Sequence, residues 1–309
     1  MLRKFDNENE WLAARAGDIT STELAALFGL SPYKSRLQLW REKAGLDEAP
    51  IVEGDAVEWG KDLQTAVGMG ICKREGWDGY DLSLYYYSDP VTRTGSSMDI
   101  KAICSKLGTG CLEIKTTERL SVEAGWTKNE VPTIYEFQIQ GQLHEAAKNG
   151  TPFDWAAVGV LAGRMKHKVY PRKYDADLGK IMDDEAMAFW DSIKAGDPPP
   201  PDYTMDGDLL ARLRKPLIAG DTIILSQDNR ACELVAEYIP LRDARRELNR
   251  QAKALEKQMD PIEVELLDKM GRNEYAKIGD YRISAKKIVV EDRVTYGHER
   301  RNFSVSKNR

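Results

Sequence analysis

Ser97-Met98-Asp99 and, after a glycine-containing turn, Glu113-Ile114-Lys115 are the two stretches that decide the fold of this chain. Apolar residues follow Asp99 and precede Glu113, and residues 105–110 between them include the Gly, Ser and Thr of a hairpin loop. The pattern predicts two adjacent antiparallel strands with one carboxylate on each. Because side chains alternate along a strand, Glu113 and Lys115 should share a face while Ile114 points into the core.

Two carboxylates and an ammonium group at one spot suit a hard divalent cation. Mg²⁺ takes oxygen ligands, keeps several waters and is commonly held by one or two carboxylates plus substrate phosphate. A neighbouring lysine could orient or deprotonate the attacking water, or stabilise charge that develops on the phosphate. The chemistry indicated is metal-assisted hydrolysis of a phosphodiester, although acids and lysines at this spacing also occur on solvated faces.

Four motifs carry a resemblance to a known family. Asp99, Glu113 and Lys115 resemble the D…E-x-K core of the PD-(D/E)XK nucleases. Residues 11–22, WLAARAGDITST, are similar to the opening W-x3-R-x-G-x-I-T-A-S of the phage lambda-type exonucleases, also called the YqaJ viral recombinase family. Residues 60–64 resemble the family's G-x3-E helix motif, and residues 135–143 resemble its Y-x2-Q-x-Q helix motif.

The resemblance implies an α/β fold with a PD-(D/E)XK, restriction-endonuclease-like core, in which helices flank a central mixed sheet. It implies an Mg²⁺-dependent exonuclease, with Mn²⁺ able to substitute, that digests linear double-stranded DNA from the 5′ end. The 3′ single-stranded tails would serve phage-type recombination by strand annealing. Similar enzymes form a homotrimeric ring around DNA and work with a single-strand annealing protein, in a bacterial cytoplasm where phage or prophage genes are expressed.

The resemblance also implies roles for residues at the hairpin and the following helix. Asp99 and Glu113 are expected to bind the metal, Lys115 to activate water, and Gln138 to assist as a further catalytic residue. Gln64 stands where the family has a glutamate, so it could reach the metal only through its amide or a water. Either the site tolerates this loss of a carboxylate or its activity is weakened.

A second group of residues is expected to hold phosphate. In the resembling family an arginine and a serine grip the 5′-phosphate of the DNA end, and Arg15 and Thr22 stand at the corresponding positions, with threonine in place of serine. A helix N-terminus there would add free backbone N–H groups that favour anions. Arg119, in the loop after Lys115, is a candidate phosphate contact and equally well an ordinary solvated arginine.

Composition and length set the outer bounds. A chain of 309 residues can bury a substantial core. No apolar run is long enough to span a bilayer and the N-terminus is too polar for a signal peptide, so no membrane partner is expected and the protein is predicted to be cytoplasmic. Four cysteines without C-x2-C spacing favour small core residues over disulfides or zinc ligands, and no iron–sulfur cluster is expected.

Charge alone does not indicate a nucleic-acid partner, because the formal net charge is −5. The distribution is uneven, however, and residues 282–309 hold eight Lys or Arg against three acids. A local basic lining matters more than the total, since phosphate contacts act within about 8 to 10 Å. The basic tail is therefore a candidate DNA contact.

The expected domain boundary lies at the proline-rich linker 196–201, giving a nuclease core over 1–200 and an arm over 201–309. Leu234, Leu241, Leu248 and Leu255 recur every seven residues and predict a coiled-coil-like helix, broken at Pro240 or starting after it. A further short helix is expected from Asp260, and a strand over 281–290. In the core, helices are expected over 20–28, 35–45, 56–75, 134–149 and 175–195, and strands over 80–87, 91–95, 153–161 and 165–170.

Other functions stay open on the sequence. The chain could be an endonuclease of the same superfamily that acts on nicks, flaps or specific sites. It could also be a DNA-end-binding protein with a decayed nuclease site, as Gln64 suggests, or an acidic α/β protein whose motif matches are coincidental.

Overall fold

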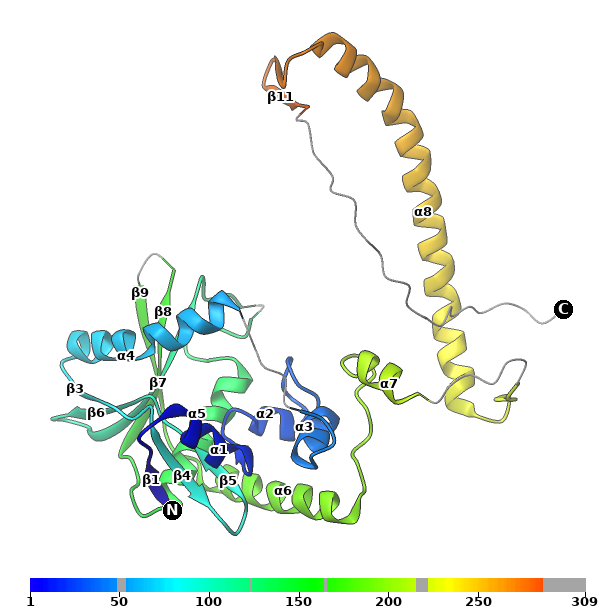
Figure 1. Ribbon diagram of the computed structural model, residues 1–309. Coiled ribbons are helices and arrows are strands. Elements are labelled where there is room, and N and C mark those ends of the chain that lie inside the picture. Colours follow the sequence, from blue (N-terminus) through cyan, green and yellow to red (C-terminus); the bar gives the residue numbers. More distant parts are fainter. Residues whose placement is uncertain (49–53, 123, 164–165, 215–221, 286–309) are drawn as a thin grey trace. The chain divides into compact units, whose positions relative to one another are not determined.

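The structure is a computed structural model that describes residues 1–48, 54–122, 124–163, 166–214 and 222–285 (Figure 1). It divides into two compact units, Met1–Lys215 and Pro216–Arg309. Each unit is described by itself below. Within the described ranges, no helix is both long and apolar enough to cross a lipid bilayer.

A five-stranded mixed sheet forms the centre of the first unit. Its strand order is β3-β6-β7-β8-β9, in which β7 pairs with β8 in parallel and the other pairs are antiparallel. The predicted hairpin is confirmed as β6 and β7, with Ile100 opposite Leu112. The strands are β3 (Asp78–Asp81), β6 (Ile100–Cys104), β7 (Gly108–Thr117), β8 (Trp155–Ala162) and β9 (Lys166–Arg172).

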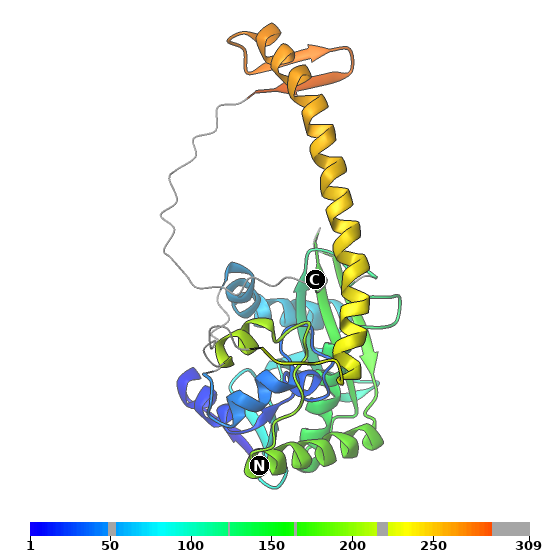
Figure 2. The same ribbon diagram turned by 90° about the vertical axis from the view of Figure 1, so that its right-hand side faces the viewer.

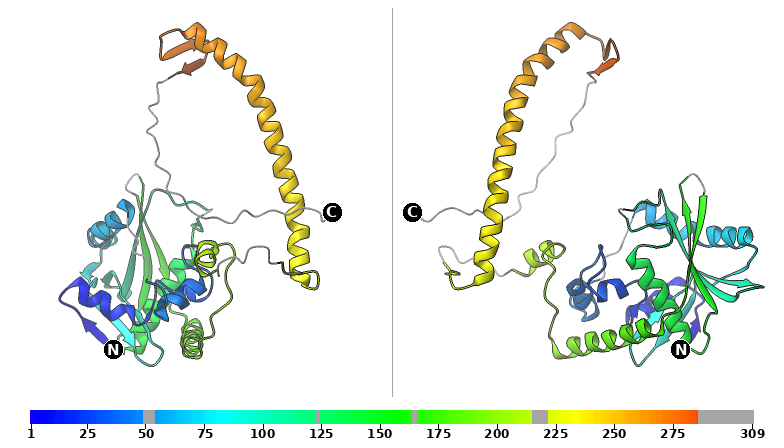
Figure 3. Two further views of the ribbon diagram at one scale, coloured as in Figure 1. Left: turned by 45° about the vertical axis from the view of Figure 1, so that its right-hand side comes forward. Right: turned by 180° about the vertical axis from the view of Figure 1, so that it is seen from behind.

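Helices cover both faces of this sheet (Figure 3). Helix α4 (Asp55–Glu75) packs against the face that carries Leu112 and Ile114. Helix α5 (Thr133–Lys148) packs against the opposite face, where Cys111 lies. Because residues alternate along β7, Glu113 and Lys115 point to the α5 face, as the sequence predicted.

A smaller four-stranded sheet and a helical cluster complete the first unit. The sheet has the order β1-β4-β5-β2, and apolar residues of α2, α3 and α6 form a separate core cluster that includes Trp40. The predicted α/β class, with a central mixed sheet flanked by helices, is thus confirmed. The elements are β1 (Leu2–Lys4), α1 (Glu8–Ala16), β2 (Ile19–Thr20), α2 (Leu24–Leu27), α3 (Arg36–Lys43), β4 (Tyr85–Asp89), β5 (Thr94–Ser96), α6 (Ala176–Ala195) and α7 (Gly207–Leu213).

The helix predicted over 20–28 is much shorter than expected. Thr20 belongs to strand β2, which pairs with β5, and helix α2 covers only Leu24–Leu27. The Glu23 carboxylate still accepts hydrogen bonds from the backbone N–H and the hydroxyl of Thr20, both at 3.0 Å. The residues of the predicted capping box therefore stabilise a turn after a strand, because pairing with β5 fixes Thr20 in an extended conformation.

Residues 201–213 lie with the first unit. Asp206, which is fully buried, accepts a 2.6 Å hydrogen bond from the Ser35 hydroxyl at the start of α3. This contact explains why the structure divides after Lys215, whereas the proline-rich linker at 196–201 placed the expected boundary at residue 200.

The second unit is built on one long helix, α8 (Asn229–Met270), followed by the hairpin of β10 (Tyr275–Ile278) and β11 (Tyr281–Ser284) (Figure 2). The expected break at Pro240 and the separate helix from Asp260 are wrong, since α8 runs through Pro240 and Pro261. Each proline removes one hydrogen-bond donor, but both prolines lie on an exposed side where water can satisfy the freed carbonyl. Residues 286–290 of the predicted strand, and most of the basic tail, lie outside the described residues.

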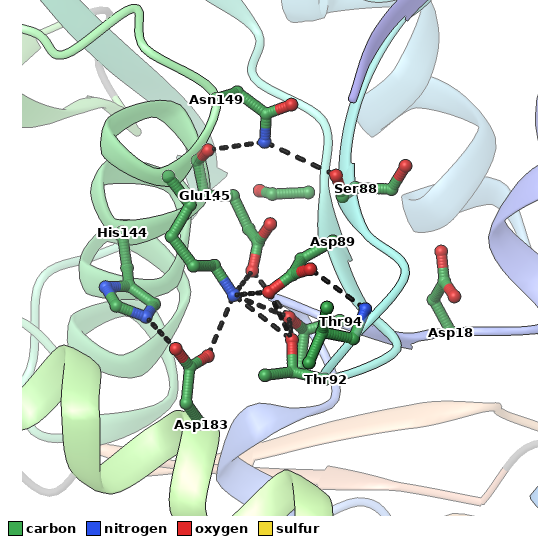
Figure 4. A network of polar contacts seen from close by, with 12 residues as sticks. Asp18, Ser88, Asp89, Thr92, Thr94, His144, Glu145, Asn149 and Asp183 are labelled. Atoms are coloured by element: carbon green, nitrogen blue, oxygen red, sulfur yellow. Dashed lines mark hydrogen bonds and ion pairs between the residues drawn. The ribbon is translucent and has the colours of Figure 1, made fainter.

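A partly buried charge network joins the C-terminal end of α5 to β4, β5 and α6 (Figure 4). The Lys148 ammonium lies 2.7 Å from Glu145, 2.8 Å from Asp183 and 3.2 Å from Asp89. Burial alone would raise the pKa values of Asp89 and Asp183, but hydrogen bonds and the charge of Lys148 outweigh it and lower both. One lysine therefore serves three carboxylates, although burial still raises the pKa of Glu145.

We expect Lys148→Met to lower the free energy of unfolding of the first unit by about 3 kcal/mol, because it removes the cation that three carboxylates share and leaves Asp183 only its contact with His144. Lowered carboxyl pKa values stabilise the folded state above the unfolded-state pKa of about 3.9, and this contribution disappears as the pH falls through the folded values. The loss should therefore be full at pH 7 and shrink below about pH 4.

Denaturant unfolding followed by tryptophan fluorescence measures this directly, since all seven tryptophans lie in the first unit. The matched control is Lys180→Met, which removes an exposed ion pair with Asp184 on α6 and should change stability far less than Lys148→Met does. Equal effects of the two substitutions would contradict the proposed importance of the network.

Candidate active site

A cleft of about 1230 Å³ opens over the start of the catalytic hairpin predicted from the sequence. Its floor contains Asp99, Glu113 and Lys115, and its walls come from α1, the 20–23 turn, α3, α4 and α5. Five basic and six acidic side chains line it, so the cleft without a cation has no excess of positive charge for a phosphate backbone. A divalent cation on its floor would reverse that balance.

Glu113 is the most enclosed charged group of the cleft, with 2% of its surface exposed. Its Oε1 accepts hydrogen bonds from Lys115 Nζ at 2.6 Å and Gln138 Nε2 at 2.7 Å. Its Oε2 accepts one from Gln142 Nε2 at 2.5 Å. Strand β7 and helix α5 thus orient this carboxylate from two directions.

Asp99 lies immediately before β6 and is oriented by the neighbouring strand and by α4. Its Oδ2 accepts a 2.7 Å hydrogen bond from the backbone N–H of Ile114, and its Oδ1 accepts a 2.6 Å bond from Gln64 Nε2. Burial, and then the charge of Glu113, raise the pKa of Asp99 well above its usual range. The two carboxylates therefore repel each other and would be stabilised by a cation placed between them.

Lys115 is the cation already present beside these carboxylates. Its Nζ also donates to Gln138 Oε1 at 3.1 Å and lies 4.8 Å from the centre of the Tyr135 ring. Burial alone would lower the pKa of Lys115, but the charges of Glu113 and Asp99 outweigh it, and the pKa is raised. The ammonium form is the favoured form in this arrangement.

The donor set fits a magnesium-like ion with few protein ligands. No cluster of three or more His, Cys, Asp or Glu side chains able to hold a metal occurs in the described part of the chain. Two carboxylates, the partly buried Asp99 and the buried Glu113, nevertheless meet the usual requirement of Mg²⁺, which completes its coordination with waters and substrate phosphate. Gln64 contributes its amide as a donor to Asp99.

Arg15 and Thr22, the predicted phosphate contacts, line the same cleft. The Arg15 guanidinium lies 4.0 Å from the centre of the Trp11 ring, on the same face of α1. None of the described side chains forms an ion pair or hydrogen bond with it. Burial lowers the pKa of Arg15 and outweighs the opposing charges of Glu23, Glu113 and Asp99, so the guanidinium is partly desolvated. Thr22 is exposed, with its hydroxyl 2.9 Å from that of Thr20.

Arg119 is not brought into this site. Its side chain is exposed, and it is not among the described residues that line the cleft. Its backbone carbonyl accepts a 3.2 Å hydrogen bond from the Thr117 hydroxyl, which closes the loop after β7.

Two residues that position the site were not among the predicted site residues. Gln142 bridges Glu113 and the carbonyl of Ser97, the latter at 3.0 Å, and Trp11 Nε1 donates to the Ser97 hydroxyl at 2.9 Å. Both fix the segment that leads to Asp99. The signal was the spacing of four residues that places Gln142 beside Gln138 on α5, and Trp11 beside Arg15 on α1.

Comparison with known proteins supports the resemblance found in the motifs. Residues 10–149 match the family described as the YqaJ-like viral recombinase domain. The uncharacterized protein YqaJ of Bacillus subtilis (strain 168) is 25% identical over 285 residues, which cover 92% of this chain and 84% of that protein. The predicted resemblance to this family is thereby confirmed.

Two of the solved structures similar to this chain are named as an exonuclease and a putative exonuclease. The alkaline exonuclease LHK-Exo from Laribacter hongkongensis is 19% identical, with a TM-score of 0.46, over 67% of this chain and 100% of that one. A putative exonuclease from Eubacterium rectale is 9% identical, with a TM-score of 0.48, over 74% of this chain and 99% of that one.

The two repelling carboxylates should cost the folded protein stability when no cation is bound. A raised pKa means that the folded state binds the Asp99 proton more tightly, so the charged form destabilises the fold increasingly as the pH rises above about 3.9. In Asp99→Asn the new oxygen can accept from the Ile114 N–H, and the Gln64 amide must turn so that its oxygen accepts from the new Nδ2. With both bonds kept, we expect this substitution to raise the free energy of unfolding by about 1 kcal/mol at pH 8 in EDTA, with the gain vanishing towards pH 4.

The measurement is again tryptophan-monitored denaturant unfolding across this pH range. Asp191→Asn, which alters an exposed ion pair on α6, serves as the control and should have almost no effect. A destabilised Asp99→Asn protein would show that the carboxylates are not in conflict.

Proposed function

From the YqaJ-like viral recombinase domain that residues 10–149 match, we propose that this chain is a divalent-metal-dependent exonuclease that digests linear double-stranded DNA from the 5′ end. Its product would be 3′ single-stranded DNA for recombination by strand annealing. The observation that carries the proposal is the convergence of Asp99, Glu113 and Lys115 on the floor of one cleft, with Arg15 in its wall.

The residues on the floor divide the work of phosphodiester hydrolysis. Asp99 and Glu113 would hold Mg²⁺, or Mn²⁺ in its place, which as a Lewis acid polarises the phosphate and lowers the pKa of a water. Lys115, kept as an ammonium by its acidic neighbours, would orient the attacking water and stabilise negative charge on the phosphate. Gln138 fixes both Lys115 and Glu113, so it would keep the carboxylate oriented during the reaction.

The wall of the cleft would select the DNA end. Arg15 presents a guanidinium without a carboxylate partner among the described residues, and guanidinium groups bind phosphate oxygens bidentately. Thr22 adds a hydroxyl near the same wall. A terminal 5′-phosphate bound there would set the direction of digestion.

The activity of the site depends on whether it tolerates Gln64 in place of the glutamate found in the resembling family. Its amide nitrogen donates to Asp99, so it orients this ligand instead of adding a third carboxylate. We propose that two carboxylates suffice, because Mg²⁺ commonly keeps several waters. A chain that binds DNA ends without cleaving them is the competing function, and the digestion experiment below separates the two.

The wider setting follows the same resemblance. We propose a homo-oligomer that encloses DNA, with a ring of three copies as the form found in similar enzymes. A single-strand annealing protein would take over the 3′ tail. The protein would act in the cytoplasm of a bacterial host, encoded by a phage or prophage.

Digestion of linear duplex DNA labelled separately at each 5′ and 3′ end tests the proposed activity. We expect loss of 5′ label with Mg²⁺, none with EDTA, and none on a covalently closed circle. Lys115→Ala should lower the rate at least about 100-fold, because it removes charge stabilisation at the reacting phosphate.

Lys101→Ala, on the neighbouring strand but outside the cleft, is the control and should change the rate less than about twofold. Cleavage of the closed circle would indicate an endonuclease. Binding of ends without digestion under any metal would leave only the end-binding function.

A separate prediction concerns end selection. We expect Arg15→Gln to weaken digestion of 5′-phosphorylated ends about 10- to 100-fold while leaving 5′-hydroxyl ends nearly unchanged, since a charge-assisted pair to phosphate contributes about 1.5 to 3 kcal/mol. Initial rates on the two substrates give the ratio. Arg3→Gln, on β1 and stacked near Phe5, should preserve the preference, and an unchanged ratio in Arg15→Gln would place the phosphate site elsewhere.

A further inference from the structure

Helix α8 carries a long exposed apolar stripe that the proposed function does not use. Leu241, Leu248, Leu255 and Ile262 recur every seven residues and are 71%, 64%, 59% and 60% exposed. Four residues after each of them comes a second seam position, occupied in turn by Arg245, Ala252, Met259 and Leu266. Spacings that alternate between four and three form a heptad seam, here nearly four heptads long, which is typical of a coiled coil.

The charges of the seam segment, residues 241–266 of α8, are separated into two halves of equal length. Residues 241–253 contain five basic and two acidic side chains, whereas residues 254–266 contain four acidic and one basic side chain. The first half thus carries a formal charge of +3 and the second −3. A second copy of the same helix complements these charges only when it runs in the opposite direction.

We propose that two copies of this chain associate through residues 241–266 of α8, paired as an antiparallel coiled coil. In the register that sets each positive half on a negative half, Leu248 packs against Met259 of the other copy and Ala252 against Leu255. The paired length is about 39 Å, since a helix rises 1.5 Å per residue. Every seam residue finds a partner because the register is symmetric.

The residues that would spoil a parallel pair fit the antiparallel one. In a parallel pair Arg245 would meet Arg245 of the other copy inside the seam, and like-charged halves would lie together. In the antiparallel pair Arg245 lies opposite Ile262, close to Glu263 and Glu265 of the other copy. Pro261 takes the third position of its heptad, on the outer side of the pair, so the bond it cannot donate does not disturb the seam.

Sedimentation of the full-length chain at micromolar concentration tests the association. We expect Leu248→Asp combined with Leu255→Asp to halve the mass of the wild-type assembly, because two charges would enter the seam of each chain. The change is from two copies to one, or from six copies to three where the α8 pairs join two of the proposed rings. The matched control is Val264→Asp, an equally exposed apolar residue of the same helix that lies off the seam, and it should leave the mass unchanged. Both proteins should keep nuclease activity per chain on short duplexes, since the seam lies outside the cleft.

Disulfide trapping tests the direction of the pair. In a Cys232→Ser background, which removes the exposed native thiol, neither Leu248→Cys nor Met259→Cys should cross-link alone. An equal mixture of the two should form a mixed dimer, because these positions face each other. Cross-linking of Leu248→Cys alone would indicate a parallel pair.

The outcomes of the two experiments show whether a second copy of this chain covers the seam. Halving of the mass together with mixed-dimer trapping supports the proposal. An unchanged mass in the double variant, or no trapping in the mixture, overturns it and leaves the seam to another part of this chain or to a different protein. Trapping does not depend on the folding of the aspartate variant, so the proposal remains testable if that variant unfolds.

Discussion

The enclosure of the Glu113 carboxylate is the constraint on which the rest of the first unit depends. A carboxylate with 2% exposure is costly unless most of its lone pairs accept hydrogen bonds, and three side chains of β7 and α5 donate to Glu113, two to Oε1 and one to Oε2. The sheet must therefore hold α5 close enough to β7 for Gln138 and Gln142 to donate hydrogen bonds to Glu113. The same arrangement leaves Asp99, which immediately precedes the neighbouring strand, in conflict with Glu113, and this is the electrostatic condition that attracts a cation.

Much of this site could be predicted from the sequence, because it depends on local periodicity. Alternation along one strand places Glu113 and Lys115 together, and a four-residue helical spacing aligns Gln138 with Gln142. The structure brings these residues into hydrogen-bond contact. What the sequence could not show is the orientation of Gln64, since its bond to Asp99 joins elements 35 residues apart.

The differences between prediction and structure arise where long-range pairing overrides local preference. Thr20 has the chemistry of a helix cap, but pairing with β5 makes it a strand residue. Pro240 reads as a helix breaker, yet α8 continues because a solvated helix can lose one hydrogen bond. Asp206 follows a proline-rich linker but returns to Ser35, and only the folded chain reveals that contact.

Helix α5 carries both the side chains that enclose Glu113 and, at its other end, the lysine of the partly buried charge network. Ten residues, or about 15 Å, separate Gln138 from Lys148 on one rigid rod. Each end holds the helix against sliding along its axis and against rotation about it. A substitution in the charge network around Lys148 would therefore shift the side chains that enclose Glu113. During evolution, residues at the two ends of α5 should be substituted together or stay unchanged.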